Sequence, residues 1–154
     1  MYLASIRPKY VYRIFTGIKK FELRKWIGLK PPTGSTIVVY ASGNVKAIVG
    51  EFRVGKVVFA KPTDIWDYLS TIEDSGVGLE DYQYIRGSKY ALALEILDPI
   101  LYVKPITLKE IKNIIPGFSP PLSFRELNRD EPLYELIIRK AREYTFRALG
   151  KGLT

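Results

Sequence analysis

Two runs of β-forming residues constrain the fold of this chain more than any other feature of its sequence. The segments STIVVYAS (35–42) and KAIVGEFRVGKVVFA (46–60) are rich in valine and aromatic residues, which favour strands. Gly50 and Gly55 interrupt the second run, and glycines inside a strand mark bulges or bends. A barrel needs such bends to close. The two runs therefore predict neighbouring strands of a small barrel or curled sheet.

Shorter patterns predict the remaining elements. Further strands are expected at 2–7, 19–25, 89–97 and 100–103, the last two separated by the turn at 98–99, and helices at 9–16, 62–71, 79–85, 107–115 and 131–149. Thr107 and Glu110 form a capping box, and Asp130 is the expected cap of the final helix. Five or six strands with helices between them predict the α+β class. No linker divides the chain, so we expect a single domain over 1–154.

The final helix is predicted to have two distinct faces. One of them gathers residues at helical spacing and is expected to pack inward: Leu133, Ile137, Ala141, Tyr144 and Ala148. Arg139, Arg142 and Phe146 lie on another face, which either extends a positive surface or is simply solvated.

The composition excludes several kinds of chemistry. The chain has no cysteine, which excludes disulfides, thiolate catalysis and cysteine zinc sites. It has no histidine, the commonest general base and metal ligand. Catalysis would rest on carboxylates, lysine, tyrosine or hydroxyls, and no cofactor or metal is predicted. No apolar run approaches the length of a membrane span, so we expect a cytoplasmic protein that does not contact membranes.

Charge is distributed unevenly along the chain, whose net charge is +8. Residues 1–30 hold eight basic residues against one glutamate, whereas residues 61–100 hold three basic residues against eight acidic ones. Clustered positive charge of this kind favours a polyanionic partner, with nucleic acid first. The alternatives are a solvated basic surface and an acidic protein partner.

The segment GIKKFELR (17–24) carries the densest charge pattern. Gly17 is a natural end for the preceding helix, and the alternation that follows indicates a half-buried strand. On a regular strand Lys20, Glu22 and Arg24 would share one face. A bulge near the start would instead bring Lys19 beside Glu22, so the register at this end stays open.

This segment resembles the G-x-K-x-x-E-x-R signature of the ASCH domain, a relative of the PUA barrel. Its surroundings agree: the segment YLASIRPKYVYRIFTGIK leads into it, VVYAS and IVGEFRVGKVV follow, and YALALEI and PPLSFREL come later. The resemblance covers about residues 2–127 and leaves 130–150 as a helical extension. It implies a barrel of five or six strands with a basic cleft that binds RNA or other nucleic acid.

Within that interpretation, the ligand contacts come from charged and aromatic side chains near the motif. Arginine and lysine would contact phosphates or base edges, glutamate would accept from a base amino group, and an aromatic ring would stack on a base. Trp26 is the aromatic residue that we expect to stack. The predicted nucleic-acid contacts are Arg7, Lys19, Lys20, Glu22, Arg24, Lys25, Trp26, Tyr40 and Ser42.

The resemblance also leaves an enzymatic alternative open. Some family members are amidohydrolases on N4-acetylcytidine that use a lysine, a threonine and a glutamate. Lys19 matches the lysine, Glu22 stands where threonine is expected, and Glu73 or Asp74 corresponds to the glutamate. Other members resemble ribonucleases. In that case the acidic residues Glu73, Asp74, Glu80 and Asp81 would hold a divalent ion, or they simply form a solvated loop and helix start.

Overall fold

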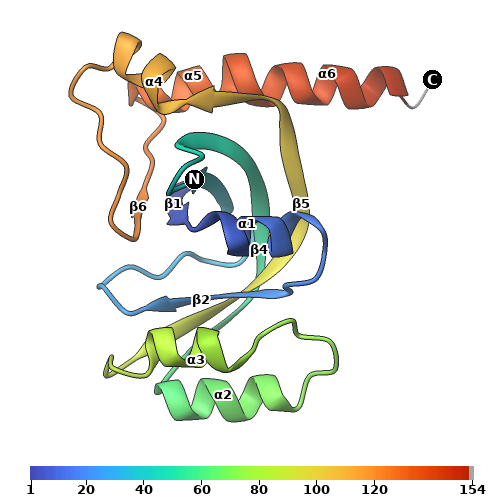
Figure 1. The fold of residues 1–154 in the computed structure, drawn as a ribbon, viewed down its shortest axis with the longest axis vertical. Coiled ribbons are helices and arrows are strands. Elements are labelled where there is room, and N and C mark those ends of the chain that lie inside the picture. The colour runs from blue at the N-terminus through green and yellow to red at the C-terminus, as the bar shows by residue number, and fades with distance from the viewer. Residues whose placement is uncertain (153–154) are drawn as a thin grey trace. The chain divides into compact units, whose positions relative to one another are not determined.

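The computed structural model describes residues 1–152 of the chain, with side chains to residue 150. Two compact units make up the fold (Figure 1). The first contains Met1–Val11, Thr36–Glu51 and the chain from Ile100 onward, and the second contains Tyr12–Ser35 and Phe52–Pro99. Both units are therefore built from separate stretches of sequence. The prediction of one domain over 1–154 stays a prediction.

Helices and strands are mixed along the chain, as the predicted α+β class requires. The elements in order are β1 (Tyr2–Ile6), α1 (Pro8–Phe15), β2 (Phe21–Lys25), β3 (Thr36–Ala41), β4 (Ala47–Ala60), α2 (Pro62–Ser70), α3 (Leu79–Ile85), β5 (Ala91–Thr107), α4 (Leu108–Ile114), β6 (Phe124–Glu126), α5 (Pro132–Leu136), the π-helical segment η1 (Ile137–Arg142) and α6 (Glu143–Gly152). The hydrogen-bonded strand order is β2-β5-β4-β3-β1-β6. The described residues form six strands, the upper value predicted from sequence, although the predicted strands 89–97 and 100–103 are joined in β5 and β6 was not predicted.

The first unit is built around β1. This strand pairs in parallel with β3 and antiparallel with β6, so that Leu3 faces Val38 on one side and Arg125 on the other. Its core combines apolar residues of the strands with those of α4 and the C-terminal helix. The buried members are Leu3, Val38, Tyr40, Ile48, Tyr102, Ile106, Ile111, Phe118, Leu127, Leu133, Leu136, Ile137 and Ala141.

The second unit holds the charged motif. Strand β2 pairs antiparallel with β5, and alternate β2 residues enter a core that α2 and α3 cover. Phe21 and Leu23 pack there with Ile65 of α2 and Ile85 of α3. In Figure 1, α2 and α3 lie side by side next to β2, and packing joins α3 to both of the others. The alternation within 19–25 therefore predicted the core-facing residues, but the prediction of a half-buried strand was wrong, because Glu22 and Arg24 on the other face are buried as well.

One predicted break is absent. The expected turn at 98–99 lies inside a single strand, β5, which continues for 17 residues. Asp98 adopts a positive φ of 49°, and its carboxylate accepts a hydrogen bond from Arg53 at 2.7 Å. Pro99 removes only one backbone donor from the strand. The local turn signal was therefore insufficient to end the strand.

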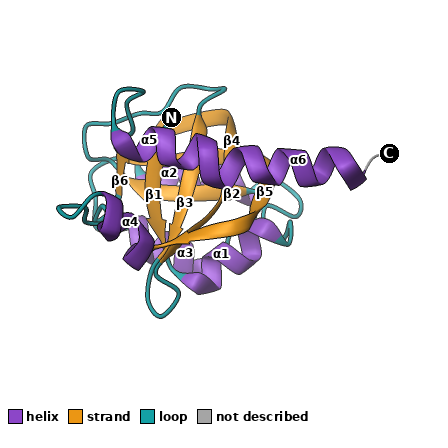
Figure 2. Ribbon diagram, turned by 90° about the horizontal axis from the view of Figure 1, so that it is seen from above, coloured by secondary structure: helices purple, strands orange, loops and turns teal. Residues whose placement is uncertain are grey.

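The C-terminal helix is continuous but not uniformly α-helical. Figure 2 shows α5, η1 and α6 running on as one rod. Its N-cap is Glu131 rather than the predicted Asp130, and Pro132 lies in the first turn. The π-helical segment has more residues per turn than an α-helix, so residues four apart lie on one face, here Ile137, Ala141 and Thr145. Thr145 is therefore buried, whereas Tyr144, predicted to point inward, is 45% exposed.

Among residues 1–152, no helix is both long enough and apolar enough to cross a membrane.

Candidate functional site

The motif begins where α1 ends. Gly17 has a φ of 80°, a conformation that favours glycine, and it turns the chain out of the helix. Strand β2 starts only at Phe21, so Lys19 precedes the strand and its backbone N–H donates to the Arg13 carbonyl at 2.9 Å. Because Lys19 lies outside the regular alternation, its side chain reaches Glu22. This resolves the register left open by the sequence, through an irregular start rather than a bulge.

Four charged side chains meet at this point, and we call them the motif cluster: Lys19, Glu22, Arg24 and Asp81. Lys19 Nζ lies 3.1 Å from Asp81 Oδ1 and 3.4 Å from Glu22 Oε2. Arg24 Nε lies 3.4 Å from Glu22 Oε1. None of the four residues is more than 5% exposed. The motif residues therefore form a buried ionic network that contains two cations and two carboxylates.

The charge balance of the cluster limits what it can do. Isolated charges are costly to bury, and each charge here faces an opposite one, which offsets that cost. A neutral, buried network does not attract a distant polyanion. One acceptor stays unused, because Glu22 Oε2 accepts no hydrogen bond among the described residues although the Lys19 ammonium is close. Buried polar atoms of this kind are uncommon and call for an explanation.

The loop before α3 brings Asp81 to the motif. The Lys20 N–H donates to the Ser75 carbonyl at 2.9 Å, which holds the loop against the motif segment. Gly76 has a φ of 74°, and a Cβ there would lie 2.0 Å from the Ile18 carbonyl oxygen. The Gly78 N–H then donates to Asp81 Oδ2 at 2.9 Å. Asp81 thus uses one oxygen at the start of α3 and the other on Lys19.

The predicted carboxylates of this loop are placed differently from Asp81. Glu73 and Asp74 both have exposed side chains, and Asp74 adopts a positive φ of 56°. Asp81 was considered from sequence only as a member of an acidic group. The signal that identifies it is its position three residues after Gly78, where an acidic side chain reaches back to the helix start. The carboxylate that this part of the chain places beside Lys19 is therefore Asp81.

The remaining predicted contacts have varied surroundings. Lys20 and Lys25 are exposed, and Trp26 is 37% exposed. Three other predicted contacts belong to the first unit: Arg7, Tyr40 and Ser42. Arg7 is exposed, and the Ser42 hydroxyl donates to the Ile6 carbonyl at 3.3 Å. Tyr40 is instead part of the core, and burial raises the pKa of its hydroxyl above the usual value.

The acidic residues do not assemble a metal site. Within residues 1–152, no group of three or more carboxylate, histidine or cysteine side chains is arranged to hold a metal ion. The four acidic residues predicted as a divalent site, Glu73, Asp74, Glu80 and Asp81, therefore do not form one in this part of the chain. Asp81 is directed at Lys19 instead.

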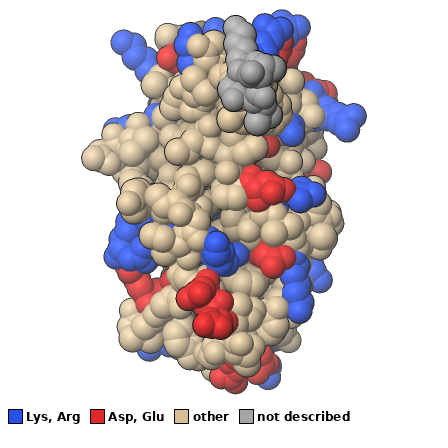
Figure 3. Space-filling model, turned by 90° about the vertical axis from the view of Figure 1, so that its right-hand side faces the viewer, with Lys and Arg blue, Asp and Glu red and all other residues tan. Residues whose placement is uncertain are grey.

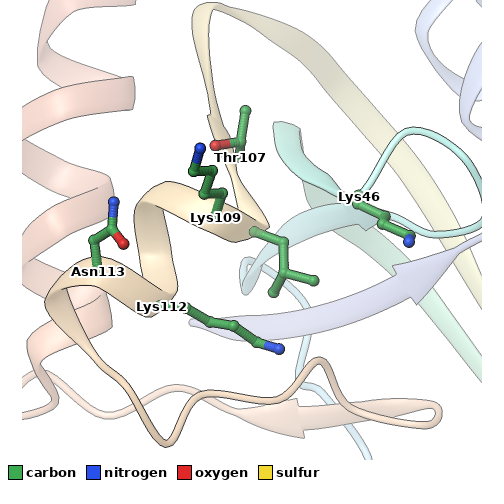
Figure 4. Close-up of a pocket in the computed structure, with 6 residues that line it drawn as sticks. Lys46, Thr107, Lys109, Lys112 and Asn113 are labelled. Carbon is green, nitrogen blue, oxygen red and sulfur yellow. The ribbon is translucent and has the colours of Figure 1, made fainter.

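A separate pocket lies in the first unit, beside α4. Its lining contains three lysines and two small polar residues: Lys46, Thr107, Leu108, Lys109, Lys112 and Asn113. Figure 4 shows Lys112 extending from α4 toward the side on which Lys46 lies, whereas Lys109 points away from it. Thr107 is occupied as the helix cap, because its hydroxyl accepts from the Glu110 N–H at 3.1 Å as predicted. No predicted contact residue lines this pocket.

Charge on the surface is also mixed. On the face shown in Figure 3, basic and acidic side chains are interspersed, with broad uncharged areas between them. The uneven charge along the sequence therefore does not produce a uniformly basic surface on this face.

Comparisons with known proteins agree with the motif. The sequence profile of the ASCH domain matches residues 5–114. The chain is 28% identical over 130 residues to an ASCH domain-containing ribonuclease of Zymomonas mobilis subsp. mobilis, a match that covers 82% of this chain and 84% of that protein.

Solved structures show the same fold. The crystal structure of ASCH from Zymomonas mobilis superposes with a TM-score of 0.75 at 25% identity, covering 91% of this chain and 94% of that one. The N-terminal domain of Staphylothermus marinus McrB, at 14% identity, has a TM-score of 0.54 and covers 90% of this chain and 93% of its own. This second likeness concerns the fold alone. The matched residues include the whole GIKKFELR segment, and the chain belongs to the ASCH domain family.

Proposed function

We propose that this chain binds RNA and that the motif cluster contacts the bound nucleotide. The observation that carries the proposal is the unused acceptor at Glu22 Oε2 in a cluster built from the family motif. The chain's relative, an ASCH domain-containing ribonuclease, supports RNA as the partner rather than another polyanion. The net charge of +8 agrees with a polyanionic ligand.

The chemistry of the cluster suits a nucleotide. A carboxylate oxygen without a hydrogen-bond donor accepts from a base amino group or from a ribose 2′-hydroxyl. Arg24 offers a planar set of donors, and Lys19 offers a point charge. Long-range attraction comes from the exposed neighbours Lys20 and Lys25 rather than from the neutral cluster. The buried residues therefore select the ligand, and the exposed residues attract it.

A matched pair of variants tests this proposal. Glu22→Gln retains size and removes the anionic acceptor, whereas Glu73→Gln makes the same change on the exposed loop nearby. Binding of fluorescently labelled single-stranded RNA is measured by anisotropy. We expect Glu22→Gln to weaken binding about tenfold or more, since hydrogen bonds to charged groups contribute roughly 1.5–3 kcal/mol. Glu73→Gln should bind like the unmodified chain.

Two results contradict the proposal. One is the absence of saturable RNA binding by the unmodified chain at low salt. The other is equal affinity of the two variants, with thermal unfolding showing that both are folded. In the second case RNA binds, but the motif cluster does not contact it.

A second candidate function is RNA cleavage, and the position of Lys19 favours it. Its ammonium lies between the carboxylates of Glu22 and Asp81, so a proton donor and a proton acceptor stand together. A carboxylate would take the proton of a ribose 2′-hydroxyl as its oxygen attacks the adjacent phosphorus. The lysine would protonate the departing 5′-oxygen, which leaves a 2′,3′-cyclic phosphate and a 5′-hydroxyl end.

Product analysis separates cleavage from binding and from amide hydrolysis. The chain is incubated with RNA and, separately, with N4-acetylcytidine, and the products are resolved by chromatography. Cleavage predicts cyclic phosphate ends that disappear in Lys19→Met and persist in Lys112→Met, which changes an exposed lysine of α4 outside the motif. Release of cytidine would assign the amidohydrolase activity instead. Intact RNA and nucleoside at high protein concentration would exclude both activities and leave binding alone.

A further inference from the structure

Three aromatic rings from separate parts of the second unit contact one another in a row, Trp26 edge-on to Phe59 and Phe59 tilted against Tyr90, and we call them the aromatic strip: Trp26, Phe59 and Tyr90. The ring centroids of Trp26 and Phe59 are 4.8 Å apart, and those of Phe59 and Tyr90 are 5.1 Å apart. The backbone N–H of Trp26 donates to the backbone carbonyl of Tyr90 at 3.1 Å, which holds the two chain segments together. The end of β2, the end of β4 and the start of β5 therefore build one continuous aromatic surface.

This surface does not belong to the hydrophobic core. Trp26 is 37% exposed and Phe59 is 39% exposed, while Tyr90 is half-buried. The core of this unit is formed by a different set of residues, centred on Phe21, Ile65 and Ile85. Large aromatic side chains that remain accessible in a row, rather than singly, indicate a binding surface.

Lysine side chains surround the strip. Lys30 Nζ lies 5.5 Å from the centroid of the Phe59 ring, and Lys89 Nζ lies 5.7 Å from that of Tyr90. Lys25 directly precedes Trp26, and its Nζ lies 5.2 Å from the centroid of the Tyr84 ring. Tyr84 is itself 44% exposed. All three lysines are exposed. Aromatic faces bordered by cations match a ligand that combines flat bases with phosphates.

We propose that the aromatic strip binds single-stranded RNA, with bases stacked on Trp26 and Phe59 and phosphates bound by Lys25, Lys30 and Lys89. This inference rests on the proposed RNA-binding function and extends it to a second, exposed surface. Stacking requires an accessible base face, which a single strand offers and a duplex encloses. The aromatic strip therefore distinguishes single-stranded from double-stranded RNA, whereas the motif cluster recognises one nucleotide.

The strip and the cluster lie next to each other along the same segment. Trp26 follows Arg24 by two residues, a distance of roughly 7 Å along an extended chain. The cluster is buried and neutral, whereas the strip is exposed and bordered by lysines. The strip thus offers a single strand an accessible contact directly after the motif segment.

The chain offers a direct optical test, because it contains only two tryptophans. Trp66 is half-buried against Tyr82, and in a Trp66→Phe background Trp26 is the only tryptophan. We expect a short oligouridylate to quench its fluorescence saturably, and the duplex with oligoadenylate to bind more weakly. Phe59→Leu, which keeps bulk but removes the ring, should weaken binding by about fivefold or more, since stacking contributes roughly 1–3 kcal/mol per base.

The controls separate failure of the strip from failure of RNA binding. Tyr12→Leu changes a tyrosine that is 66% exposed in α1 and outside the strip, and it should leave affinity unchanged. Unquenched Trp26 with normal affinity in Phe59→Leu would overturn the strip while RNA binding stands. Equal affinity for the duplex would also overturn it. No RNA binding by the unmodified chain in anisotropy would overturn both proposals.

Discussion

The Lys19 ammonium lies 3.1 Å from the Asp81 carboxylate, and this contact joins the segment before β2 to helix α3. Asp81 uses its other oxygen to accept the Gly78 N–H at 2.9 Å. One carboxylate thus completes an ion pair and the start of a helix. The motif cluster and the loop before α3 therefore depend on each other for stability.

This dependence predicts strong coupling between Lys19 and Asp81. Lys19→Met leaves buried carboxylates with Arg24 as their remaining cation in the cluster, and removal of one partner of a buried pair costs about 3–5 kcal/mol of unfolding free energy. Combining it with Asp81→Asn removes the one carboxylate charge that Arg24 does not balance. The loss of unfolding free energy in the double variant should therefore be smaller than the sum of the two single-variant losses by roughly 1–3 kcal/mol.

Urea unfolding of the unmodified chain, the two single variants and the double variant measures the coupling energy between the two side chains. Lys20→Met, in the exposed neighbouring lysine, should change stability by less than about 0.5 kcal/mol. Strict additivity of Lys19→Met and Asp81→Asn would show that the two side chains do not interact in solution.

Two glycines of the same loop make opposite predictions. At Gly76 the φ is 74° and a Cβ would lie 2.0 Å from a backbone oxygen, so Gly76→Ala should destabilise by more than about 2 kcal/mol. At Gly78 the φ is −116° and a Cβ would meet nothing within 4 Å. Gly78→Ala should stay within about 1 kcal/mol of the unmodified chain.

Thermal unfolding compares the two glycine variants directly. If Gly76→Ala also disturbs the motif, its RNA affinity should fall at temperatures where it remains folded. Similar melting temperatures for Gly76→Ala and Gly78→Ala would contradict the close approach of the loop to Ile18.

The motif shows what local sequence can predict. Lys19, Glu22 and Arg24 were expected together because six residues hold all three, and strand geometry limits where they point. Asp81 comes from a distant helix, and no local pattern connects it to Lys19. Tertiary folding also unites the rings of the aromatic strip, of which only Trp26 was expected to bind. Long-range neighbours of this kind are set by packing, which periodicity does not reveal.

The C-terminal helix shows a different limit. Its existence follows from spacing and caps, but the π-turn of η1 changes which residues face inward. Thr145 is buried, and its hydroxyl accepts the Val103 N–H at 2.9 Å. A polar residue satisfied by a strand backbone carries no apolar signal in the sequence. The predicted inward face was therefore wrong at Tyr144 and at Ala148, which are both exposed.

The buried hydroxyl of Tyr102 is expected to make the stability of the fold depend on pH in the alkaline range. Its hydroxyl donates to Glu51 Oε1 at 2.7 Å in the first unit, and Arg142 Nε lies 3.5 Å from the same oxygen. Burial, and then the Glu51 carboxylate, raise the pKa of Tyr102 well above 10. Above about pH 10 the unfolded chain releases this proton and the folded chain retains it, so the stabilisation falls as pH rises.

Tyr102→Phe removes this sensitivity. The variant should be less stable at neutral pH by roughly 1–3 kcal/mol, because Glu51 loses a buried donor. Between about pH 10 and 11 its stability should then decline less steeply than that of the unmodified chain. Urea midpoints across this range measure both effects, with the exposed Tyr12→Phe as control. Parallel declines in all three proteins would show that Tyr102 does not cause the alkaline loss.

The lysines beside the aromatic strip predict the salt dependence of RNA binding. Each phosphate neutralised on a single strand contributes about 0.7 to the slope of log affinity against log salt concentration. Lys30→Ala and Lys89→Ala should each reduce the slope by about this amount, because each removes one phosphate contact. Lys112→Ala, in the lysine pocket beside α4, is the matched control and should leave the slope unchanged. Equal reductions of the slope in all three variants would indicate diffuse attraction of RNA by the whole basic chain. They would contradict binding of the RNA at a defined position along the aromatic strip.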